Sequence, residues 1–414
     1  MPFSSLGLCP ALINALCELA YSEPSPVQTV AIPAILAGRD TLVSAQTGSG
    51  KTAAFCLPIL QSLLNHVTAS PRTVQILILV PTRELAAQVG DTLRTLAQHL
   101  PQPFKLAVLF GGVSINPQML HLRGGADIVI ATPGRLLDLV EQNAVKLDGV
   151  RCLVLDEADR LLDLGFSDEL NRILALLPSQ RQNLFFSATI SAEVETLAQG
   201  LLHDPIRIEI ETNEVSAPDI TQRAIVVDAD KRTQLLRHLI EHQKWSRVLV
   251  FVATKYSAEL VAVKLRRAGL HAEPFHGDLS QGKRTQVLMD FKASRVQVVI
   301  ATDVAARGID ISDLPVVVNY DLPRSSDDYT HRIGRTGRAG ESGVAVNFIC
   351  ADHANEAHFR LIELRHHQKI IREIVAGFEP TKPTTSASPV ALDNNGGIKG
   401  KRPSKKDKLR ALAS

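Results

Sequence analysis

Aromatic residues are scarce in this chain of 414 residues, where Phe, Trp and Tyr together make up 4%. A nucleic-acid site built on stacked bases needs aromatic side chains among its basic residues, so the composition argues against such a platform. No apolar run approaches the ~20 residues that a membrane-spanning helix needs. The first residues, MPFSSLGLCPAL, lack the basic start and long apolar core of a signal peptide. We therefore expect a cytoplasmic protein with no membrane partner.

Disulfide and metal-binding patterns are also missing. The cysteines include no CxxC pair and no ligand-like spacing, and none of the thirteen histidines stands in a metal-binding pattern. The formal net charge is only +2, so a polyanion would have to meet a local basic patch. We interpret the cysteines as small hydrophobic residues of a reducing compartment; they are Cys9, Cys17, Cys56, Cys152 and Cys350.

Short apolar runs alternate with longer segments of helical spacing in the first half of the chain. Strands that are apolar throughout and separated by helices are typical of a parallel sheet covered by helices on both faces. Ligands bind beyond the carboxyl ends of the strands in such sheets, where this chain has polar or glycine-bearing stretches. The predicted strands are Thr41–Ser44, Gln75–Val80, Leu106–Phe110, Asp127–Ala131, Cys152–Leu155 and Asn183–Phe186.

A second series of apolar runs follows the polar, proline-containing stretch EIETNEVSAPD and predicts a second α/β domain. Only the first domain has a glycine-rich loop, because the strand that we match to it in the second half ends in FVATK. The predicted strands here are Ala224–Val227, Val248–Val252, Val296–Ile300, Val316–Val318 and Val344–Phe348. We predict domains at 1–208 and 223–378, a linker at 209–222 and a disordered basic tail at 379–414.

Residues 45–52, AQTGSGKT, stand between a predicted strand and an apolar helical segment, which is the setting of a phosphate-binding P-loop. In such a loop backbone N–H groups cradle phosphates, the lysine reaches the β- and γ-phosphates, and the last hydroxyl ligates Mg²⁺. The usual pattern has glycine where this chain has alanine, so spacing alone leaves a flexible loop as the alternative. The candidate nucleotide-binding residues are Ala45, Gln46, Thr47, Gly48, Ser49, Gly50, Lys51 and Thr52.

Three acids, Asp156, Glu157 and Asp159, follow directly after the predicted strand Cys152–Leu155. Acids there can simply complement the positive end of a helix dipole. A strand-end acid downstream of a P-loop is also the natural second anchor for Mg²⁺, and the cation would offset the clustered charge. On that interpretation Asp156 joins Thr52 as a metal ligand, and Glu157 orients or deprotonates the attacking water. Asp159 then hydrogen-bonds a neighbouring segment.

The four residues from Asp156 to Asp159 spell DEAD, and across roughly residues 1–375 the chain resembles the DEAD-box ATP-dependent RNA helicases. Its compact core and short extensions resemble bacterial helicases of the RhlE-like kind. The resemblance implies two RecA-like domains, joined by a short linker, that bind ATP with Mg²⁺ and RNA across their cleft.

The N-terminal segment resembles the adenine-reading element of that family, in which we place Phe3, Tyr21 and Gln28. A glutamine amide can donate to and accept from the adenine edge, which would favour ATP over GTP. The family usually has Gly-Phe where this chain has Ala20 and Tyr21, a departure that keeps an aromatic surface. Taken alone, Gln28 would be interpreted as a solvated helix residue.

The stretch HRIGRTGR places Arg335 and Arg338 where the family has arginine fingers, although an isolated instance would indicate a solvated basic helix. Asp310 matches the position that contacts the nucleotide ribose. Ser187 and Thr189 could cap a helix, and the resemblance also implies a link between the acids and the second domain. The residues implied in coupling between the domains are Asp159, Ser187, Thr189, Asp303 and His331.

Strand-end loops supply the RNA contacts that the resemblance implies. Hydroxyls, guanidiniums and glycine N–H groups suit phosphate and sugar rather than base edges, which predicts sequence-independent binding. Each loop alone is equally consistent with an ordinary turn, so the inference depends on the whole set of loops in their order along the chain. The candidate residues are Pro81, Thr82, Arg83, Gly111, Gly112, Thr132 and Arg135 in the first domain, and Lys255, Gly277, Arg284, Thr302 and Arg307 in the second.

The sequence thus predicts an enzyme that hydrolyses ATP and locally unwinds short RNA duplexes or remodels ribonucleoprotein. A DNA translocase and an RNA-bound clamp that hydrolyses little remain the alternatives. Ribosomal or RNA-decay assemblies are candidate partners. The basic residues after position 398 are expected to tether RNA or, alternatively, to serve only solubility.

Overall fold

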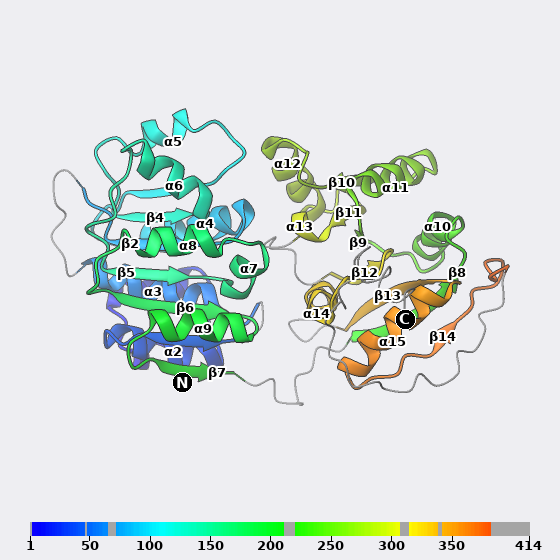
Figure 1. Cartoon of the computed structure of the whole chain (residues 1–414), viewed down its shortest axis with the longest axis horizontal. Coiled ribbons are helices and arrows are strands. Elements are labelled where there is room, and N and C mark those ends of the chain that lie inside the picture. Colours follow the sequence, from blue (N-terminus) through cyan, green and yellow to red (C-terminus); the bar gives the residue numbers. More distant parts are fainter. Residues whose placement is uncertain are drawn as a thin grey trace, which may run out of the picture.

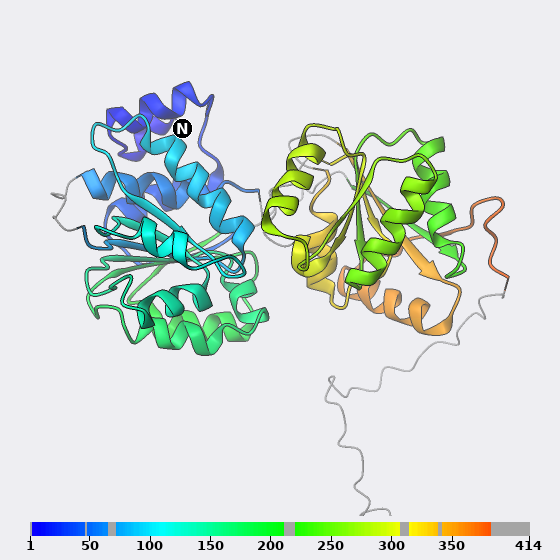
Figure 2. The same cartoon turned by 90° about the horizontal axis from the view of Figure 1, so that it is seen from above.

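The chain forms two α/β domains side by side, and each has one parallel β-sheet between layers of helices (Figures 1 and 2). This computed structural model describes residues 2–45, 48–64, 72–210, 220–306, 314–337 and 342–381. The last strand of domain one is β7 (Ile206–Glu209), and the first strand of domain two is β8 (Ile220–Val227). The predicted fold class, a pair of parallel sheets each covered by helices on both faces, is confirmed.

The sheet of domain one has seven strands among the described residues, and every pairing between neighbours is parallel. Its spatial order is β3-β4-β2-β5-β6-β1-β7. The bounds in that order are Leu106–Leu109, Ile128–Ala131, Ile76–Leu79, Cys152–Leu155, Gln182–Ser187, Thr41–Ser44 and Ile206–Glu209.

The sheet of domain two also has seven strands in the described part of the chain, in the order β10-β11-β9-β12-β13-β8-β14. All of its neighbouring strands run parallel. The bounds in that order are Ala272–Phe275, Val298–Thr302, Val248–Val252, Val316–Asn319, Gly343–Cys350, Ile220–Val227 and Arg372–Glu373.

Each sheet separates two apolar cores because successive residues of a strand point to opposite faces. In β2, Ile76 and Ile78 pack with helices α2 (Pro26–Leu36), α3 (Lys51–Leu64) and α4 (Arg83–Ala97). Leu77 and Leu79 pack on the other face with α6 (Pro133–Glu141), α8 (Ser167–Leu174) and α9 (Ala192–Leu201). This double burial explains why the strand is apolar at every position.

The helices of domain one are η1 (Phe3–Leu6), α1 (Pro10–Glu18), α2 (Pro26–Leu36), α3 (Lys51–Leu64), α4 (Arg83–Ala97), α5 (Asn116–His121), α6 (Pro133–Glu141), α7 (Ala158–Asp163), α8 (Ser167–Leu174) and α9 (Ala192–Leu201). Those of domain two are α10 (Arg232–His242), α11 (Lys255–Arg267), α12 (Gln281–Lys292), α13 (Asp303–Ala306), α14 (Ser326–Ile333) and α15 (His353–Arg365). Several begin after a residue whose side chain accepts a hydrogen bond from the first turn, which satisfies a donor that the helix leaves free. These capping residues are Thr82, Ser191, Thr254, Ser280, Ser325 and Asp352.

Three strands of the structure were not predicted, and a fourth starts earlier than predicted. Strands β7, β10 and β14 were not predicted, and β8 starts at Ile220, inside the predicted linker of 209–222. Strand β10 contains a proline, and β14 has two residues, so neither gives a clear apolar pattern. Residues 211–219 and 382–414, which include most of the predicted linker and tail, lie outside the described residues.

The cysteines are free, as expected, but they are not all buried. Cys56, Cys152 and Cys350 are buried, whereas Cys17 is exposed and Cys9 is partly exposed. Burial raises the pKa of the Cys152 thiol to about 12, which makes it unreactive. Within the described residues, no helix has the length and apolarity required to cross a membrane.

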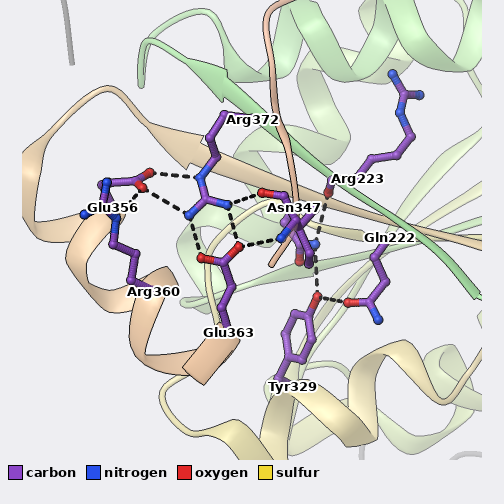
Figure 3. A network of polar contacts seen from close by, with 9 residues as sticks. Gln222, Arg223, Tyr329, Asn347, Glu356, Arg360, Glu363 and Arg372 are labelled. Carbon is purple, nitrogen blue, oxygen red and sulfur yellow. Dashed lines mark hydrogen bonds and ion pairs between the residues drawn. The ribbon is translucent and has the colours of Figure 1, made fainter. Parts of the chain in front are cut away.

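A polar network fixes the edge of the second sheet (Figure 3). The Arg372 guanidinium of β14 lies between Glu356 and Glu363 of α15, at 3.0 and 2.7 Å. Beside it, the amide of Asn347 donates to the hydroxyl of Tyr329 at 3.1 Å, and that hydroxyl donates to the side chain of Gln222 at 2.7 Å. Burial raises the pKa of Tyr329 to about 12, so its hydroxyl stays protonated as this donor. The network therefore holds α14 on strands β8 and β13.

Candidate nucleotide and nucleic-acid site

The P-loop connects β1 to α3, and its glycines adopt a backbone that other residues avoid. Gly48 and Gly50 have φ angles of 84° and 92°, in the left-handed region that glycine enters without a steric cost. Helix α3 starts at Lys51, whose buried ammonium donates to the carbonyl of Ala45. Burial lowers the pKa of Lys51, while the charge of Asp156 acts in the opposite direction. The loop therefore places a lysine near the acid cluster at a helix N-terminus.

The N-terminal segment contacts the P-loop through Gln28. Its amide oxygen accepts from the Ser25 N–H at 2.9 Å, and its amide nitrogen donates to the Gly50 carbonyl at 3.1 Å. A Cβ at Gly50 would lie 2.6 Å from that nitrogen, so this contact also requires glycine. Gln28 is buried, and these two bonds use one N–H and one oxygen lone pair of its amide, which has a second of each.

The rings of Phe3 and Tyr21 meet edge to face, with their centroids 6.4 Å apart. Phe3 is buried, whereas Tyr21 is 40% exposed and keeps an aromatic surface beside this segment. Ala20 has a φ of 58°, where a residue with a Cβ is strained by about 1–2 kcal/mol. The alanine that replaces the usual glycine therefore keeps the left-handed backbone at an energetic cost.

The acids that follow β5 are buried at the start of α7. Asp156, Glu157 and Asp159 are 3%, 7% and 6% exposed. Burial, followed by the charge of Glu157, raises the pKa of Asp156 to about 7, although Lys51 opposes the shift. Glu157 has a φ of 51°, and its carboxylate accepts a hydrogen bond from Arg160 at 2.9 Å. A strained backbone and a concentration of buried charge are features that cluster at functional sites.

Asp159 connects the acid cluster to the end of β6. One carboxylate oxygen accepts from the Ala188 N–H at 3.2 Å and from both the N–H and the hydroxyl of Thr189 at 3.0 Å. The Ser187 hydroxyl donates to the Thr189 carbonyl at 2.7 Å and accepts from the Asp159 N–H at 3.3 Å. The next helix along the chain, α9, is not capped by these hydroxyls, because it begins after Ser191, whose own side chain is the cap.

Arg332 joins the segments that carry the predicted coupling residues in domain two. Its guanidinium pairs with both carboxylate oxygens of Asp303 at 2.6 and 2.7 Å and donates to the Asn319 side chain at 3.0 Å. It also lies 4.9 Å from the centre of the Phe251 ring. The structure therefore places Asp303 in a contact within domain two, while Arg335 is buried just beyond the end of α14.

His331 of α14 is electrostatically linked to α7 of domain one. Figure 1 shows α7 and α14 on the facing sides of the two domains. Burial, and next the positive charge of Arg160, lowers the pKa of His331 to about 4, while Asp159 acts in the opposite direction. The second domain thus presents a neutral imidazole to the acid cluster at physiological pH.

A direct ion pair joins α4 of domain one to α12 of domain two. The Arg284 guanidinium lies 3.0 Å from the Glu84 carboxylate, and the Gln281 amide donates to the same carboxylate at 3.4 Å. Burial lowers the pKa of Arg284, whose guanidinium also lies 4.9 Å from the centre of the Phe275 ring. The predicted RNA-binding arginine is therefore engaged in a contact between the domains.

The predicted RNA-binding loops of domain one lie against one another. The Arg83 guanidinium packs on Gly112, where an added Cβ would lie 2.5 Å from it. Arg135 donates to the Val113 carbonyl at 2.8 Å and so ties a third loop to the same place. The structure thus brings together the loops that follow β2, β3 and β4, with Pro81, Thr82, Arg83, Gly111, Gly112, Thr132 and Arg135.

In domain two the corresponding loops follow β9, β10 and β11. Lys255 pairs with Asp278 at 2.5 Å, which joins the first helix residue after β9 to the loop after β10 that contains Gly277. His276 in that loop contacts the Glu259 carboxylate at 2.9 Å, and Thr302 is buried at the end of β11.

Five predicted site residues lie outside the described residues: Gln46, Thr47, Arg307, Asp310 and Arg338. Arg160 and Arg332 contact predicted site residues but were not assigned a role from the sequence. For Arg160 the available signal was its spacing, because residues three apart on a helix are neighbours and Glu157 stands three positions earlier.

The fold and the site together define a nucleotide-hydrolysing enzyme with two RecA-like domains. Residues 25–197 match the family model described as DEAD/DEAH box helicase, and residues 230–340 match the helicase conserved C-terminal domain. The chain belongs to the DEAD-box ATP-dependent RNA helicases.

Relatives and solved structures agree with this assignment. The chain is 40% identical to the DEAD-box ATP-dependent RNA helicase RhpA of Helicobacter pylori, over 84% of this chain and 69% of that protein. It is 42% identical to the ATP-dependent rRNA helicase rrp3 of Sclerotinia sclerotiorum, over 84% of this chain and 71% of that protein. The structure of S. cerevisiae Dbp5 bound to RNA and ADP BeF3 is similar, with a TM-score of 0.79 and 31% identity over 92% of this chain and 95% of that chain.

Proposed function

We propose that this helicase grips RNA mainly by its sugar-phosphate backbone and locally separates short duplexes or remodels ribonucleoprotein when ATP closes its two domains. The observation that carries the proposal is the approach of α14 in domain two to the acid cluster of domain one. Arg160 and Asp159 both influence the pKa of His331 across that approach. A nucleotide held by domain one would therefore lie within reach of domain two.

Residues from both domains would form the nucleotide pocket. Gln28 and the aromatic pair of Phe3 and Tyr21 would receive adenine, while Gly48–Lys51 would receive the phosphates. Support comes from the Gln28–Gly50 hydrogen bond, which joins the two parts of the pocket, and from the left-handed glycine backbone of the loop. Arg335 would approach the γ-phosphate from domain two. The proposed set of nucleotide-binding residues also includes Asp310, Arg338 and the remaining loop residues Ala45, Gln46 and Thr47.

The donor set suits Mg²⁺. Carboxylate and hydroxyl oxygens are the protein ligands that this ion prefers, and Asp156 and Thr52 supply one of each. Among the described residues, no three His, Cys, Asp or Glu side chains gather to hold a metal, so phosphates and water would complete the shell. The bound cation would neutralise charge on the phosphate oxygens. Asp156, whose pKa is raised to about 7, must lose its proton to serve as a ligand.

Proton release tests this assignment. Binding of Mg·ATP at pH 6.5 should release a proton from Asp156, because the bound cation favours the ionised carboxylate. Calorimetry in two buffers of different ionisation enthalpy measures the release. Asp156→Asn should lose both the proton release and the thermal stabilisation by Mg·ATP. Equal proton release by the wild-type protein and this variant would remove Asp156 as the ligand.

Glu157 is the proposed general base. As the water oxygen bonds to the γ-phosphorus, the bond from phosphorus to the β–γ bridging oxygen breaks, ADP leaves with the electron pair, and Glu157 takes the water proton. Glu157→Gln should lower turnover by about 10²–10⁴-fold while nucleotide binding persists, because the amide keeps the shape but cannot accept the proton. Single-turnover hydrolysis and binding of a fluorescent ATP analogue measure the two effects. Unchanged turnover would remove the assigned role.

RNA would lie across both domains, on the loops that follow β2, β3 and β4 in one sheet and β9, β10 and β11 in the other. Contact between the Arg83 guanidinium and Gly112 supports a single surface in domain one. Because linkage is reciprocal, an ATP analogue should tighten single-stranded RNA binding by the same factor as RNA tightens the analogue. An analogue affinity indifferent to RNA would exclude this scheme, and equal stimulation by DNA of the same length would favour a DNA translocase.

A further inference from the structure

Arg160 is the buried guanidinium of the acid cluster. It lies on α7 and is 2% exposed, and its Nη1 donates to Glu157 Oε2 at 2.9 Å. The backbone makes a second link, because the Arg160 N–H donates to the Glu157 carbonyl at 3.0 Å. Both the main chain and the side chain of Glu157 are therefore held by the same residue.

This ion pair differs from the other arginine–acid pairs that span one helical turn. Arg94–Asp91 has the same three-residue spacing, but both side chains are at least half exposed. In the Arg160–Glu157 pair the side chains are 3% and 10% exposed, so water cannot replace either partner easily. The Glu157 backbone is also in the left-handed region, at a φ of 51°, which restricts where its side chain can point.

The Arg160 guanidinium also lies near domain two. Its Nη2 is buried and has no hydrogen-bond partner among the described residues. His331 of α14 is near enough for the charge of Arg160 to lower its pKa, together with burial. Arg160 thus contacts Glu157 and lies near domain two.

We propose that Arg160 is a positioning residue for Glu157, which it holds in one orientation from the resting enzyme through to the hydrolytic step. The inference rests on the proposed role of Glu157 as the base. Arg160 itself does not transfer a proton, because its guanidinium stays charged. A freely rotating carboxylate would spend part of its time turned away from the water. Holding it in one orientation keeps it directed at the water when the reaction step occurs.

The test replaces the guanidinium and separates turnover from binding. Arg160→Met should lower the RNA-saturated kcat at least tenfold and leave the KM for ATP within about twofold, because only orientation in the reaction step is lost. Arg160→Lys should recover part of the loss, since an ammonium can still bond the Glu157 carboxylate. Arg172→Met is the matched control, because Arg172 makes a comparable 2.6 Å pair with Glu141 on the exposed surface of the same domain. This control should keep the wild-type kcat.

A double-variant cycle distinguishes positioning from a general structural role. If Arg160 acts through Glu157, the variant with both Glu157→Gln and Arg160→Met should turn over no more slowly than Glu157→Gln alone. The inference would be overturned if the kcat losses of the two single variants multiplied in the double variant, or if a folded Arg160→Met kept the wild-type kcat. Either result would leave the proposed role of Glu157 as the base intact. If Glu157→Gln itself retains full turnover, the proposed function fails first. Thermal melting of each variant identifies loss of fold.

Discussion

The two sheets have the same strand order, and each strand of domain two takes the place of the strand seven earlier in the chain. The order β3-β4-β2-β5-β6-β1-β7 becomes β10-β11-β9-β12-β13-β8-β14. The strand equivalent to β1 is therefore β8. The strand ending in FVATK, which we had matched to the P-loop strand, is β9 and corresponds to β2. The predicted match between the FVATK strand and the P-loop strand was therefore wrong.

The proposed RNA loops occur as equivalent pairs in the two domains. Thr82 after β2 and Thr254 after β9 both cap the following helix by accepting from an N–H three positions later, at 3.2 and 3.0 Å. The first helical residue is basic in each, Arg83 in α4 and Lys255 in α11. The same backbone thus presents the same chemistry twice, which suits a polymer with a repeating backbone.

The nucleotide loops are not equivalent. In domain one, β1 leads into the P-loop, and β5 leads into acids that stay near Lys51. In domain two, the strand equivalent to β5 leads into Asp321, which is bound by Arg232 of α10 at 2.6 Å. Arg232 also lies 4.4 Å from the centre of the Tyr320 ring. Acids that lie near Lys51 in one domain are replaced at the equivalent strand end by an ion pair in the other, so the two domains differ in loop chemistry rather than in fold.

Substitution of the equivalent cations should give the largest contrast. Lys51→Ala should lower kcat/KM for ATP by about 10²–10³-fold, because it removes the positive charge proposed to stabilise the phosphates. Arg232→Ala should leave turnover near the wild-type value and lower the melting temperature, since Asp321 loses its partner. Steady-state ATPase assays with saturating RNA and thermal melting compare the two. A large loss of kcat/KM in a well-folded Arg232→Ala would show that domain two also contributes a nucleotide site.

Much of this comparison could be predicted from the sequence, because apolar strands and the polar stretches that end them are local patterns. Strand β5 and the acids beyond it are contiguous in the chain, and so are β1 and its glycine loop. The equivalence of β8 to β1 was missed because the first residues of β8, 220–223, are polar after Ile220 and fall next to the predicted linker. Strand order depends on pairing between distant segments, which a local pattern does not contain.

Partners across the domains could not be predicted for the same reason. Arg284 stands in a basic stretch that suits RNA, yet its burial depends on Glu84, two hundred residues earlier and in the other domain. The raised pKa of Asp156 depends first on burial, which follows from packing on all sides. The Arg160–Glu157 pair lies within domain one, and its one-turn spacing was visible in the sequence.

The paired RNA loops give a smaller and symmetrical expectation. Arg83→Ala and Lys255→Ala should each weaken single-stranded RNA binding by about tenfold, as expected for one charge-assisted contact with a phosphate. Each should also reduce the slope of log affinity against log salt by about one. Fluorescence anisotropy across a salt series measures both quantities. Unequal slopes would mean that only one of the two domains holds the phosphate backbone at this position.

The smallest expected effect concerns the pH dependence of domain closure through His331. Its pKa of about 4 in this arrangement lies below the ordinary 6.5, first because of burial and then because of Arg160. Closure therefore favours the neutral imidazole. The closed arrangement of the domains has its full stability above pH 6.5 and loses stability as the pH falls toward about 4. At pH 6 the loss should be about fourfold in the closure equilibrium. Fluorescence energy transfer between the domains, with an ATP analogue and RNA bound, measures it. His331→Asn removes this titration and leaves the other titrating groups in place, Asp156 among them. The difference between wild type and variant isolates His331, and identical pH profiles would place its ring away from the junction.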